Sequence, residues 1–360
     1  MKKFLLGKTP LELKAIVLDL KLPSFTANQI ADWLYKKRVD TIDQMTNLSK
    51  VAREKLQVEY QVGKITYTHV QESADGTKKY LFPCHTNTSV ETVMIPDSTR
   101  STICVSSQAG CKMACKFCMT GRQGFMGNLK VNEILSQFLS IDEGENLTNA
   151  VFMGMGEPLD NLENVLKVIE ILTADWGLAW SPKRITLSSI GVNMRPQLFE
   201  LPDYRQEEKN RGSYSGVNPL KAFLDLTKVH LAISLHNSFA AERGEIMPME
   251  KAFPIEETIS LIKKYDFTGQ RRVSFEYIMF NRLNDSKRHA DAIVRMVKGL
   301  ECRVNLIRFH AIPESPLSPS PMHVIESFRD RLNKSGVTAT IRASRGEDIF
   351  AACGMLAGKK

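Results

Sequence analysis

The segment GCKMACKFCMTG holds three cysteines within eight positions, Cys111, Cys115 and Cys118. It follows the run STICVSS, which has the character of a strand, so the thiols stand on a loop at a strand end. Three thiolates at Cys-x3-Cys-x2-Cys spacing can hold one face of a metal centre. A cubane iron–sulfur cluster held in this way keeps one iron open for a further ligand. A zinc site with Cys104 as fourth thiolate is the alternative, but the gap of seven residues from Cys104 to Cys111 fits the paired spacing of such sites poorly.

The number of cysteines also favours metal or catalytic use over a disulfide framework. The 360-residue chain has seven, an odd number, and four of them lie between positions 104 and 118. The apolar run at residues 4–6 is too short for a signal peptide, and no apolar stretch approaches the ~20 residues that span a bilayer. We therefore expect a cytoplasmic protein without membrane contact, whose thiols stay reduced.

Residues 1–65 are predicted to form a small helical accessory domain. TPLE, TANQ and TIDQ, which begin at Thr9, Thr26 and Thr41, have the spacing of capping boxes ahead of apolar-periodic runs. A basic cluster, Lys36 to Arg38, lies beside these runs. We expect this domain to contact a polyanion such as RNA, because its basic cluster adds to a formal net charge of +8 for the chain.

The rest of the chain changes pattern twice. Residues 66–98 show alternating runs with Asp75-Gly76 as a hairpin turn, which predicts a short antiparallel appendage linking to the core. From residue 99 to residue 345 strands alternate with amphipathic helical runs, the pattern of parallel βαβ units. An α/β fold in the form of a partial (β/α) barrel is expected, followed by a C-terminal segment, residues 346–360. The candidate strands are STICVSS, AVFMG, RITLSS, VHLAISLH, VSFEYIMF, VNLIRFH and TATIRAS.

In barrels of this kind the chemistry lies at the carboxyl ends of the strands. In VHLAISLHN, the small and polar residues His230, Ala232, Ser234 and His236 share one face, and the apolar residues share the other. This alternation predicts a lumen that holds something hydrophilic. Residues 202–219 have no clear period and are interpreted as a surface insertion of unknown role.

The cysteine loop resembles that of the radical S-adenosylmethionine (SAM) superfamily, with Phe117 in the aromatic place of Cys-x3-Cys-x-aromatic-Cys. The resemblance implies a [4Fe–4S] cluster whose open iron binds the amino and carboxylate groups of SAM. It also implies a low-potential electron donor such as flavodoxin or ferredoxin, and reductive cleavage of SAM to a 5′-deoxyadenosyl radical. GMGEP at 154–158 resembles the superfamily's element for the SAM amino group. There Gly156 allows close backbone approach, and Glu157 can accept from the ammonium.

Several separated motifs together resemble the RlmN/Cfr family of radical SAM adenine methyltransferases. They are CVSSQAGCKMACKFC, VFMGMGEPL, ISLH, VNLI and RGEDIFAACG. The resemblance implies methylation of carbon 2 of an adenosine in the peptidyl transferase centre of 23S rRNA and of the tRNA adenosine 3′ to the anticodon. Carbon 2 of adenine has no lone pair and no acidic proton, so it cannot displace the methyl group of SAM directly. The family solves this problem with two further cysteines.

By that resemblance, Cys353 first takes a methyl group from one SAM as a thiolate nucleophile. The radical from a second SAM removes a hydrogen atom from the S-methyl group, and the carbon radical adds to the adenine. Cys104 then attacks the sulfur of Cys353, which forms a transient disulfide and releases the methylated base. Glu91 matches the family's general base. It shares a strand face with Val93 and Ile95, so a raised pKa is expected for its carboxyl group.

The resemblance also supplies positions that contact SAM at strand ends. These positions are Ser188, Ser234, Leu235, His236 and His310, in addition to Gly156 and Glu157. Two departures stand out: many relatives have Asn in the place of His310, and they usually have Asp where this chain has Phe350. Cys84 and Cys302 match no family role and are interpreted as structural.

Three alternatives remain open. A Cfr-type enzyme would methylate carbon 8 with the same catalytic residues, but GEP at 156–158 and SRGED at 344–348 resemble the carbon-2 group more. A radical SAM activase or methylthiolase is disfavoured, because Cys104 and Cys353 would then have no role. The alternative that is not an enzyme is a zinc-stabilised RNA-binding module.

RNA contact is a hypothesis from charge and resemblance. The formal net charge of +8 is compatible with a polyanion, although a merely basic surface explains it as well. An adenine in folded RNA must leave its stack to enter a barrel. The candidate phosphate contacts are Lys36, Lys37, Arg38, Lys78, Lys79, Arg271, Arg272, Arg303, Arg308, Arg331, Arg342 and Arg345.

Overall fold

The computed structural model describes residues 2–191, 218–269 and 271–358. Its core is a ten-stranded sheet in the order β14-β13-β12-β11-β10-β9-β6-β5-β4-β3. The predicted insertion at 202–219 lies outside the described residues except for its last two positions.

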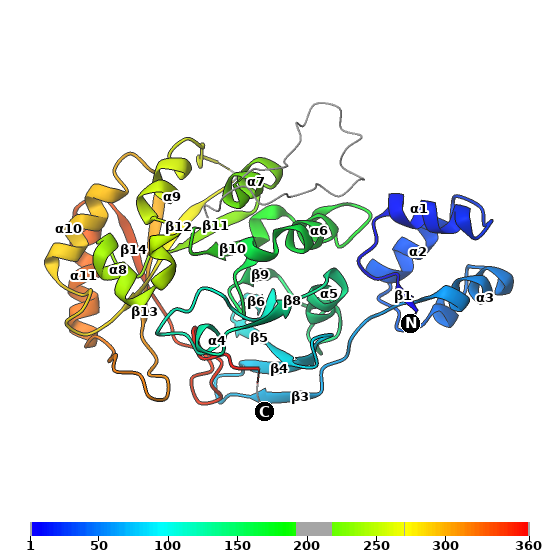
Figure 1. Ribbon diagram of the computed structural model, residues 1–360, viewed down its shortest axis with the longest axis horizontal. Coiled ribbons are helices and arrows are strands. Elements are labelled where there is room, and N and C mark those ends of the chain that lie inside the picture. The colour runs from blue at the N-terminus through cyan, green and yellow to red at the C-terminus, as the bar shows by residue number, and fades with distance from the viewer. Residues whose placement is uncertain (1, 192–217, 270, 359–360) are drawn as a thin grey trace.

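The parallel part of the sheet contains every strand that was predicted for the barrel. The strands are β6 (Arg100–Cys104), β9 (Asn149–Phe152), β10 (Ile185–Ser189), β11 (His230–Ser234), β12 (Val273–Met279), β13 (Cys302–Arg308) and β14 (Thr338–Arg342). In this order each strand pairs in parallel with the next. The α/β partial barrel is therefore confirmed, and the carboxyl ends of all seven strands meet at one edge (Figure 1).

Three antiparallel strands, β3 (His69–Glu72), β4 (Lys78–Pro83) and β5 (Ser89–Asp97), extend this same sheet. The Asp75-Gly76 hairpin turn joins β3 to β4 as predicted, with Gly76 at φ 80°. Because β5 pairs with β6 over Val93 to Asp97, the antiparallel strands form one edge of the barrel sheet rather than a separate appendage.

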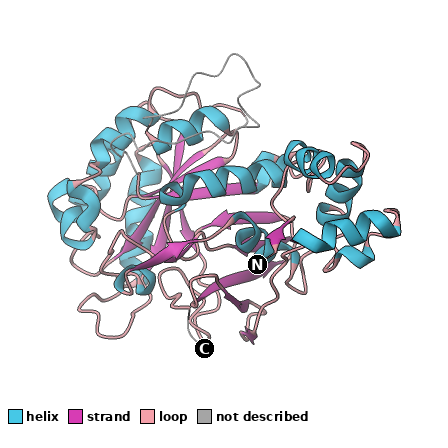
Figure 2. Ribbon diagram, turned by 45° about the vertical axis from the view of Figure 1, so that its right-hand side comes forward, coloured by secondary structure: helices cyan, strands magenta, loops and turns pink. Residues whose placement is uncertain are grey.

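Helices cover the outer face of the sheet (Figure 2). They are α5 (Val131–Leu139), α6 (Leu162–Thr173), α7 (Pro219–Leu226), α8 (Ala240–Ile246), α9 (Ile255–Ile262), α10 (Lys287–Met296) and α11 (Met322–Lys334). Their apolar faces join the strands in one continuous hydrophobic core. None of the helices among the described residues combines the length and the apolar character that crossing a membrane requires.

The N-terminal domain consists of α1 (Pro10–Asp19), α2 (Thr26–Tyr35) and α3 (Lys50–Glu59), with a two-residue parallel pair of β1 (Lys3–Phe4) and β2 (Tyr60–Gln61). The capping box at Thr9 is confirmed, because Thr9 and Glu12 exchange side-chain hydrogen bonds with each other's backbone. The box expected at Thr26 is wrong: Thr26 is already inside α2, and its side chain is buried. Gln44 accepts from the backbone of Thr41, but this box opens only one turn of 3-10 helix.

This domain packs against the barrel on the side of α5 and α6 (Figure 1). Tyr35 of α2 contacts Trp176 after α6 at 5.6 Å between ring centroids, and Lys167 of α6 pairs with Glu12 of α1 at 2.6 Å. The apolar core runs without interruption from the helical domain into the barrel. The two parts therefore form one packed body.

The cysteine loop is held by two elements that the sequence pattern did not predict. A short hairpin of β7 (Gln108–Gly110) and β8 (Phe125–Asn128) closes its base, and α4 (Met119–Arg122) follows its last cysteine. Gly121 is required inside this turn, because a Cβ there would lie 2.9 Å from the backbone nitrogen of Cys115. The backbone of the cysteine loop thus packs directly against α4.

Candidate active site

Two adjoining cavities lie at the carboxyl ends of the barrel strands. The inner cavity, of about 150 Å³, is lined by the three loop cysteines and by residues that follow β9, β10 and β11. The outer cavity, of about 450 Å³, opens between β5, β6, β14 and the C-terminal segment. The residues that line both cavities are Cys118, Met153, Gly154, Ile307, Arg342, Cys353 and Gly354. A molecule bound in one cavity therefore touches the wall of the other.

The loop cysteines form one wall of the inner cavity. Along residues 111–118 burial alternates, so that Cys111, Met113, Cys115 and Phe117 are buried and the residues between them are exposed. Burial raises the pKa of Cys111 to about 12 and raises those of Cys115 and Cys118 as well. These thiols stay protonated at neutral pH until a metal centre binds them as thiolates.

This wall suits a metal cluster in which each thiolate binds a different iron. Among the described residues, no three His, Cys, Asp or Glu side chains gather as a site for a single ion. The three thiols instead share a cavity with open space in front of them. In a cubane cluster each thiolate binds a different iron, so three thiols on one cavity wall are a donor set that would fit such a cluster.

The GMGEP turn faces the cysteine wall across the inner cavity. Gly156 has φ 98°, and a Cβ there would lie 2.5 Å from the Cβ of Gln108, so only glycine fits. Glu157 is buried, and its two carboxyl oxygens accept from the backbone of Leu159 and Ile190 at 3.1 and 3.0 Å. Burial, only partly offset by these bonds, raises the pKa of Glu157 to about 7.

The serine and histidine positions on β10 and β11 divide between two locations. Ser188, Ser234 and His236 line the inner cavity, as the strand-face alternation predicts. Leu235 does not line either cavity; its side chain is fully buried on the other strand face. His236 accepts at Nδ1 from the backbone of Ile278, and burial lowers the pKa of His236 to about 3. The ring is therefore neutral, with Nε2–H as its remaining donor.

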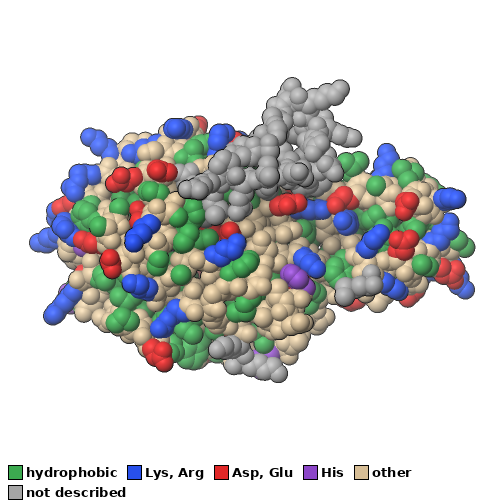
Figure 3. All heavy atoms as spheres, in the orientation of Figure 1, with side chains coloured by type: hydrophobic (Ala, Val, Ile, Leu, Met, Phe, Trp, Pro, Cys, Tyr) green, Lys and Arg blue, Asp and Glu red, His purple; other side chains and the backbone are tan. Residues whose placement is uncertain are grey.

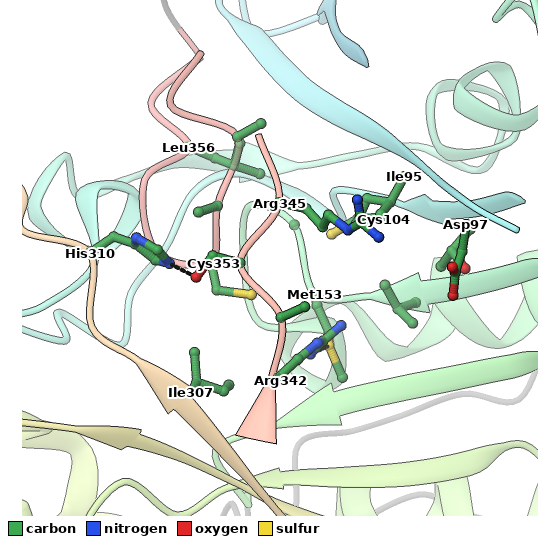
Figure 4. A pocket seen from close by; sticks show the side chains of 18 of the residues that line it. Ile95, Asp97, Cys104, Met153, Ile307, His310, Arg342, Arg345, Cys353 and Leu356 are labelled. Atoms are coloured by element: carbon green, nitrogen blue, oxygen red, sulfur yellow. Dashed lines mark hydrogen bonds between the residues drawn. The ribbon is translucent and has the colours of Figure 1, made fainter. Parts of the chain in front are cut away.

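Cys104 and Cys353 both line the outer cavity, from β6 and from the C-terminal segment (Figure 4). They differ in access: Cys353 is exposed, whereas Cys104 is 8% exposed. Burial, with a smaller contribution from Cys353, raises the pKa of Cys104 to about 12. Of the two thiols, Cys353 is thus the accessible one. Cys104 is buried in another wall of the cavity and stays protonated at neutral pH.

Arg342 lies where the two cavities join, and its role in the site was not predicted. Its Nη1 lies 3.6 Å from a carboxyl oxygen of Glu276 on β12 and 3.4 Å from the sulfur of Met153. Burial alone would lower the pKa of Arg342, but nearby thiol and carboxyl groups, foremost that of Cys353, raise it above its ordinary value. A cation is therefore held beside the cysteine that the motif predicts to be nucleophilic.

Glu276 is the second residue that sequence reasoning missed. It is buried on the lumen face of β12, opposite Ser234 of β11 and Asn305 of β13 in register. One carboxyl oxygen accepts from Asn305 at 2.7 Å and from Ser274 at 3.0 Å. The other oxygen has no hydrogen-bond donor within the described residues and points to Arg342. The alternation in VSFEYIM was the signal that could have identified it.

The loop that carries Cys353 is anchored to the β3–β4 hairpin. Asp75 accepts from the backbone of Gly346 at 3.0 Å, and Asp348 accepts from Ser73 and from the backbone of Ala74. Phe350 is the residue that departs from the family pattern. It is exposed and has φ 53°, so it projects from the loop without lining either cavity.

Two predicted site residues lie elsewhere than expected. His310 lines the outer cavity rather than the inner one, where its Nε2 contacts the hydroxyl of Ser344 at 3.1 Å (Figure 4). Glu91 lines neither cavity. It is buried, pairs with Lys79 at 3.1 Å, and accepts from the backbone of Ala357 and Gly358. Its carboxylate is thus held by charge and hydrogen bonds, not by apolar neighbours alone.

Burial and ion pairs distinguish the candidate phosphate contacts from one another. Lys79 and Arg271 are buried, so the prediction of phosphate contact is wrong for both. Lys78 pairs with Glu143, and Arg331 pairs with both oxygens of Asp291. In the basic cluster of the helical domain, Arg38 is half-buried, whereas Lys36 and Lys37 are exposed and Lys37 pairs with Asp32.

Comparisons with known proteins agree with this geometry. The model of the ribosomal RNA large subunit methyltransferase N-terminal domain (RlmN_N) matches residues 4–62, and that of the radical SAM superfamily matches residues 105–293. A solved structure of a radical SAM methyltransferase from Sphaerobacter thermophilus is similar over 99% of both chains, with a TM-score of 0.85 and 32% identity.

Curated relatives match along the whole chain. A probable dual-specificity RNA methyltransferase RlmN from Parabacteroides distasonis is 52% identical over 359 residues, which cover 100% of this chain and 98% of the relative. A dual-specificity RNA methyltransferase RlmN from Syntrophus aciditrophicus is 38% identical over 97% of this chain and 94% of its own length.

Proposed function

The chain belongs to the RlmN family of radical SAM methyltransferases, and from this premise we propose how its residues divide the work of methylating RNA. It is a radical SAM enzyme with a [4Fe–4S] cluster and SAM as cofactors, and it methylates carbon 2 of adenosine in 23S rRNA and in tRNA. We place it in the cytoplasm, where both RNAs are found.

One observation supports this division most: an exposed thiol, a buried thiol and the cysteine loop meet around two adjoining cavities. When bound, the cluster and SAM supply a methyl group and a 5′-deoxyadenosyl radical. Cys111, Cys115 and Cys118 would hold the cluster in the inner cavity. The cavity's polar groups, Glu157 and the neutral His236, would then bind and orient SAM.

Cys353 is the methyl acceptor in this proposal, because it is the accessible thiol and lines both cavities. Arg342 lines both cavities together with Cys353, so it is the proposed cation beside the sulfur that attacks the methyl group. Cys104, on the opposite wall of the outer cavity, is placed to attack the sulfur of Cys353 when the methylated base leaves.

Glu91 is the proposed general base, but the hydrogen bonds that its carboxylate accepts must break before it can act. Its Oε2 accepts from Ala357 and Gly358, so the C-terminal segment must move before that oxygen can reach a substrate proton. Thr120 and Gln123 donate to the carbonyls of Leu356 and Ala357, and the backbone of Met119 donates to that of Gly354, so these bonds also hold the segment. The other carboxyl oxygen of Glu91 is paired with Lys79.

The outer cavity is the proposed pocket for the target adenosine. Its lining includes Arg100, Arg342, Arg345 and His310 against a single acid, Asp97, which gives it a positive potential suited to a nucleotide. Figure 3 shows Lys and Arg side chains spread over this face of the barrel and of the helical domain, so the outer surface alone marks no single RNA path.

Arg345→Ala is expected to weaken RNA binding and to lower the slope of log affinity against log salt by about one. Arg345 is partly exposed and lines the outer cavity, which is the proposed pocket for the target adenosine. Arg303→Ala is the matched control, because Arg303 is exposed near the beginning of β13, at the opposite end of the barrel. Filter binding at several salt concentrations measures both. An equal dependence of affinity on salt for the two variants would contradict the assignment of Arg345 to the RNA-binding pocket.

Glu157→Gln is expected to weaken SAM binding about ten-fold, since a charged acceptor for the ammonium is lost. With a pKa raised to about 7, Glu157 becomes neutral as the pH falls through that value. Affinity of the wild type should therefore fall between about pH 8 and about pH 6, and the variant should lose this dependence. Equilibrium dialysis on cluster-loaded protein measures it, with the exposed Glu163→Gln as control. Parallel pH profiles for wild type and variant would contradict the assignment.

Mass spectrometry of nucleosides tests the function as a whole. RNA from a strain that lacks such enzymes is incubated anaerobically with the protein, SAM and dithionite. 2-Methyladenosine in both 23S rRNA and tRNA is the expected product. 8-Methyladenosine would instead assign the chain to the carbon-8 group.

A further inference from the structure

The outward face of the cysteine loop carries exposed groups that the proposed function leaves unused. Lys112, Ala114 and Lys116 are exposed, and they alternate with the buried residues of the inner cavity wall. Phe125 and Met126 of β8, at the base of the same loop, are 39% and 43% exposed. We call these five residues the cluster-loop face.

Contacts between these groups hold the face together. The Nζ of Lys112 lies 4.3 Å from the ring centroid of Phe125 and 2.9 Å from Asp160. Asp160 is almost fully buried beneath this lysine, so the charge presented to solvent is positive. Lys116 has no ion pair within the described residues, and its backbone nitrogen donates to the carbonyl of Ile246. The side chain of Lys112 is thus held in place by Phe125 and Asp160, whereas Lys116 is positioned through its backbone.

A shallow surface groove of about 600 Å³ begins at Lys116 and continues along α8. Its other charged lining residues are Lys251, Glu245 and Glu250, and Glu250 is buried and paired with Arg243. Beside the positively charged loop there is thus a concave surface next to the buried thiols. A protruding group of another molecule could lie within it.

We propose that the cluster-loop face is the docking surface of a small acidic protein that carries one electron at a time. This inference rests on the proposed function, because the cluster needs an electron from outside. The loop is one chain thick: Cys111 and Cys115 face the cavity, and their direct neighbours Lys112 and Lys116 face solvent. A donor on this face stands closer to the cluster than it could anywhere behind the barrel helices.

The composition of the face fits such a partner better than it fits RNA. Opposite charges across an interface speed the encounter of two proteins, and electron-transfer encounters bury less than about 1,200 Å². The ring of Phe125 is covered by Lys112 on one side, which hinders stacking of a base there. The face shares no residue with the lining of the outer cavity, so the proposed sites for RNA and donor are separate.

The experiment compares two sources of electrons. Lys112→Gln with Lys116→Gln removes the charges, and Phe125→Ser with Met126→Ser removes the apolar part. Lys298→Glu is the control, since Lys298 is exposed in the turn before β13 at the opposite end of the barrel. Bleaching of the oxidised cluster is followed in a stopped-flow instrument with reduced flavodoxin, with reduced ferredoxin, and with dithionite.

Both face variants should be reduced about ten-fold more slowly than wild type by at least one of the two proteins, with a weaker salt dependence for the charge variant. Reduction by dithionite and RNA binding should be unchanged. Wild-type rates with both proteins would overturn the proposal. Equal losses with dithionite or in RNA binding would overturn it too, and would assign the face to cluster support or to RNA. Failure of the proposed function appears separately, as wild-type protein that dithionite reduces but that methylates no RNA.

Discussion

Cys353→Ala is expected to lose RNA methylation by more than about a thousand-fold, because the variant has no atom that can carry the methyl group. The neighbouring residues provide no replacement, since Cys104 is buried behind the site and burial raises its pKa to about 12. Nucleoside mass spectrometry gives the loss. The intact mass of the protein gives its cause, as wild type gains one methyl group from SAM and the variant gains none.

The loss should be chemical rather than structural. Cys353 is exposed, and a substitution at an exposed position usually changes the free energy of unfolding by less than about 0.5 kcal/mol. The variant should keep its cluster and still cleave SAM under reduction, which yields 5′-deoxyadenosine without methylated RNA. Cys302→Ala is the matched control, because this partly buried cysteine lies at the start of β13, away from both cavities. Methylation that persists in Cys353→Ala would refute the role of this thiol.

The parts of the site that could be predicted from the sequence are those in which one local segment contains the whole signal. The cysteine loop and the GMGEP turn each place their residues within a few positions, and both follow strands whose pattern is plain. Ser188, Ser234 and His236 followed from strand alternation together with the rule that barrel chemistry lies at strand ends.

The parts that could not be predicted depend on pairs of residues far apart in the chain. Arg342 and Glu276 meet because β12, β13 and β14 pair in one register, and no local pattern states that register. The interaction of Lys79 with Glu91 likewise requires β4 beside β5. A lysine read as a phosphate contact therefore proved to be buried, and a carboxylate expected among apolar neighbours proved to be paired.

Local sequence patterns also gave wrong predictions where tertiary packing determines where a helix begins or where a side chain points. Thr26 has the spacing of a capping residue, but its side chain is buried among the helices, and α2 begins one residue earlier than a box would allow. Leu235 lies on the strand face that points away from the inner cavity, so its side chain lines neither cavity, and its carbonyl accepts from Arg243.

Cys104→Ala is expected to stop the reaction at a different stage, with the protein bound covalently to its RNA. Cys353 would still receive its methyl group, because it is exposed and lines the inner cavity, which Cys104 does not line. The carbon bridge between its sulfur and the adenine would then form, but no second thiol could attack that sulfur to release the base. Cys118 also lines the outer cavity, but it is one of the three proposed cluster ligands, so it is not available to replace Cys104.

The adduct distinguishes this variant from a merely damaged one. On a denaturing gel, Cys104→Ala should give a slower band that ribonuclease digestion removes, in roughly one equivalent of the active protein. Cys104→Ser, which preserves the volume of the side chain, should behave in the same way, so a cavity left by alanine cannot be the cause. The double variant Cys104→Ala, Cys353→Ala should give no adduct, because the carbon bridge starts at Cys353. Multiple turnovers by Cys104→Ala at the wild-type rate would mean that release of the base requires no disulfide.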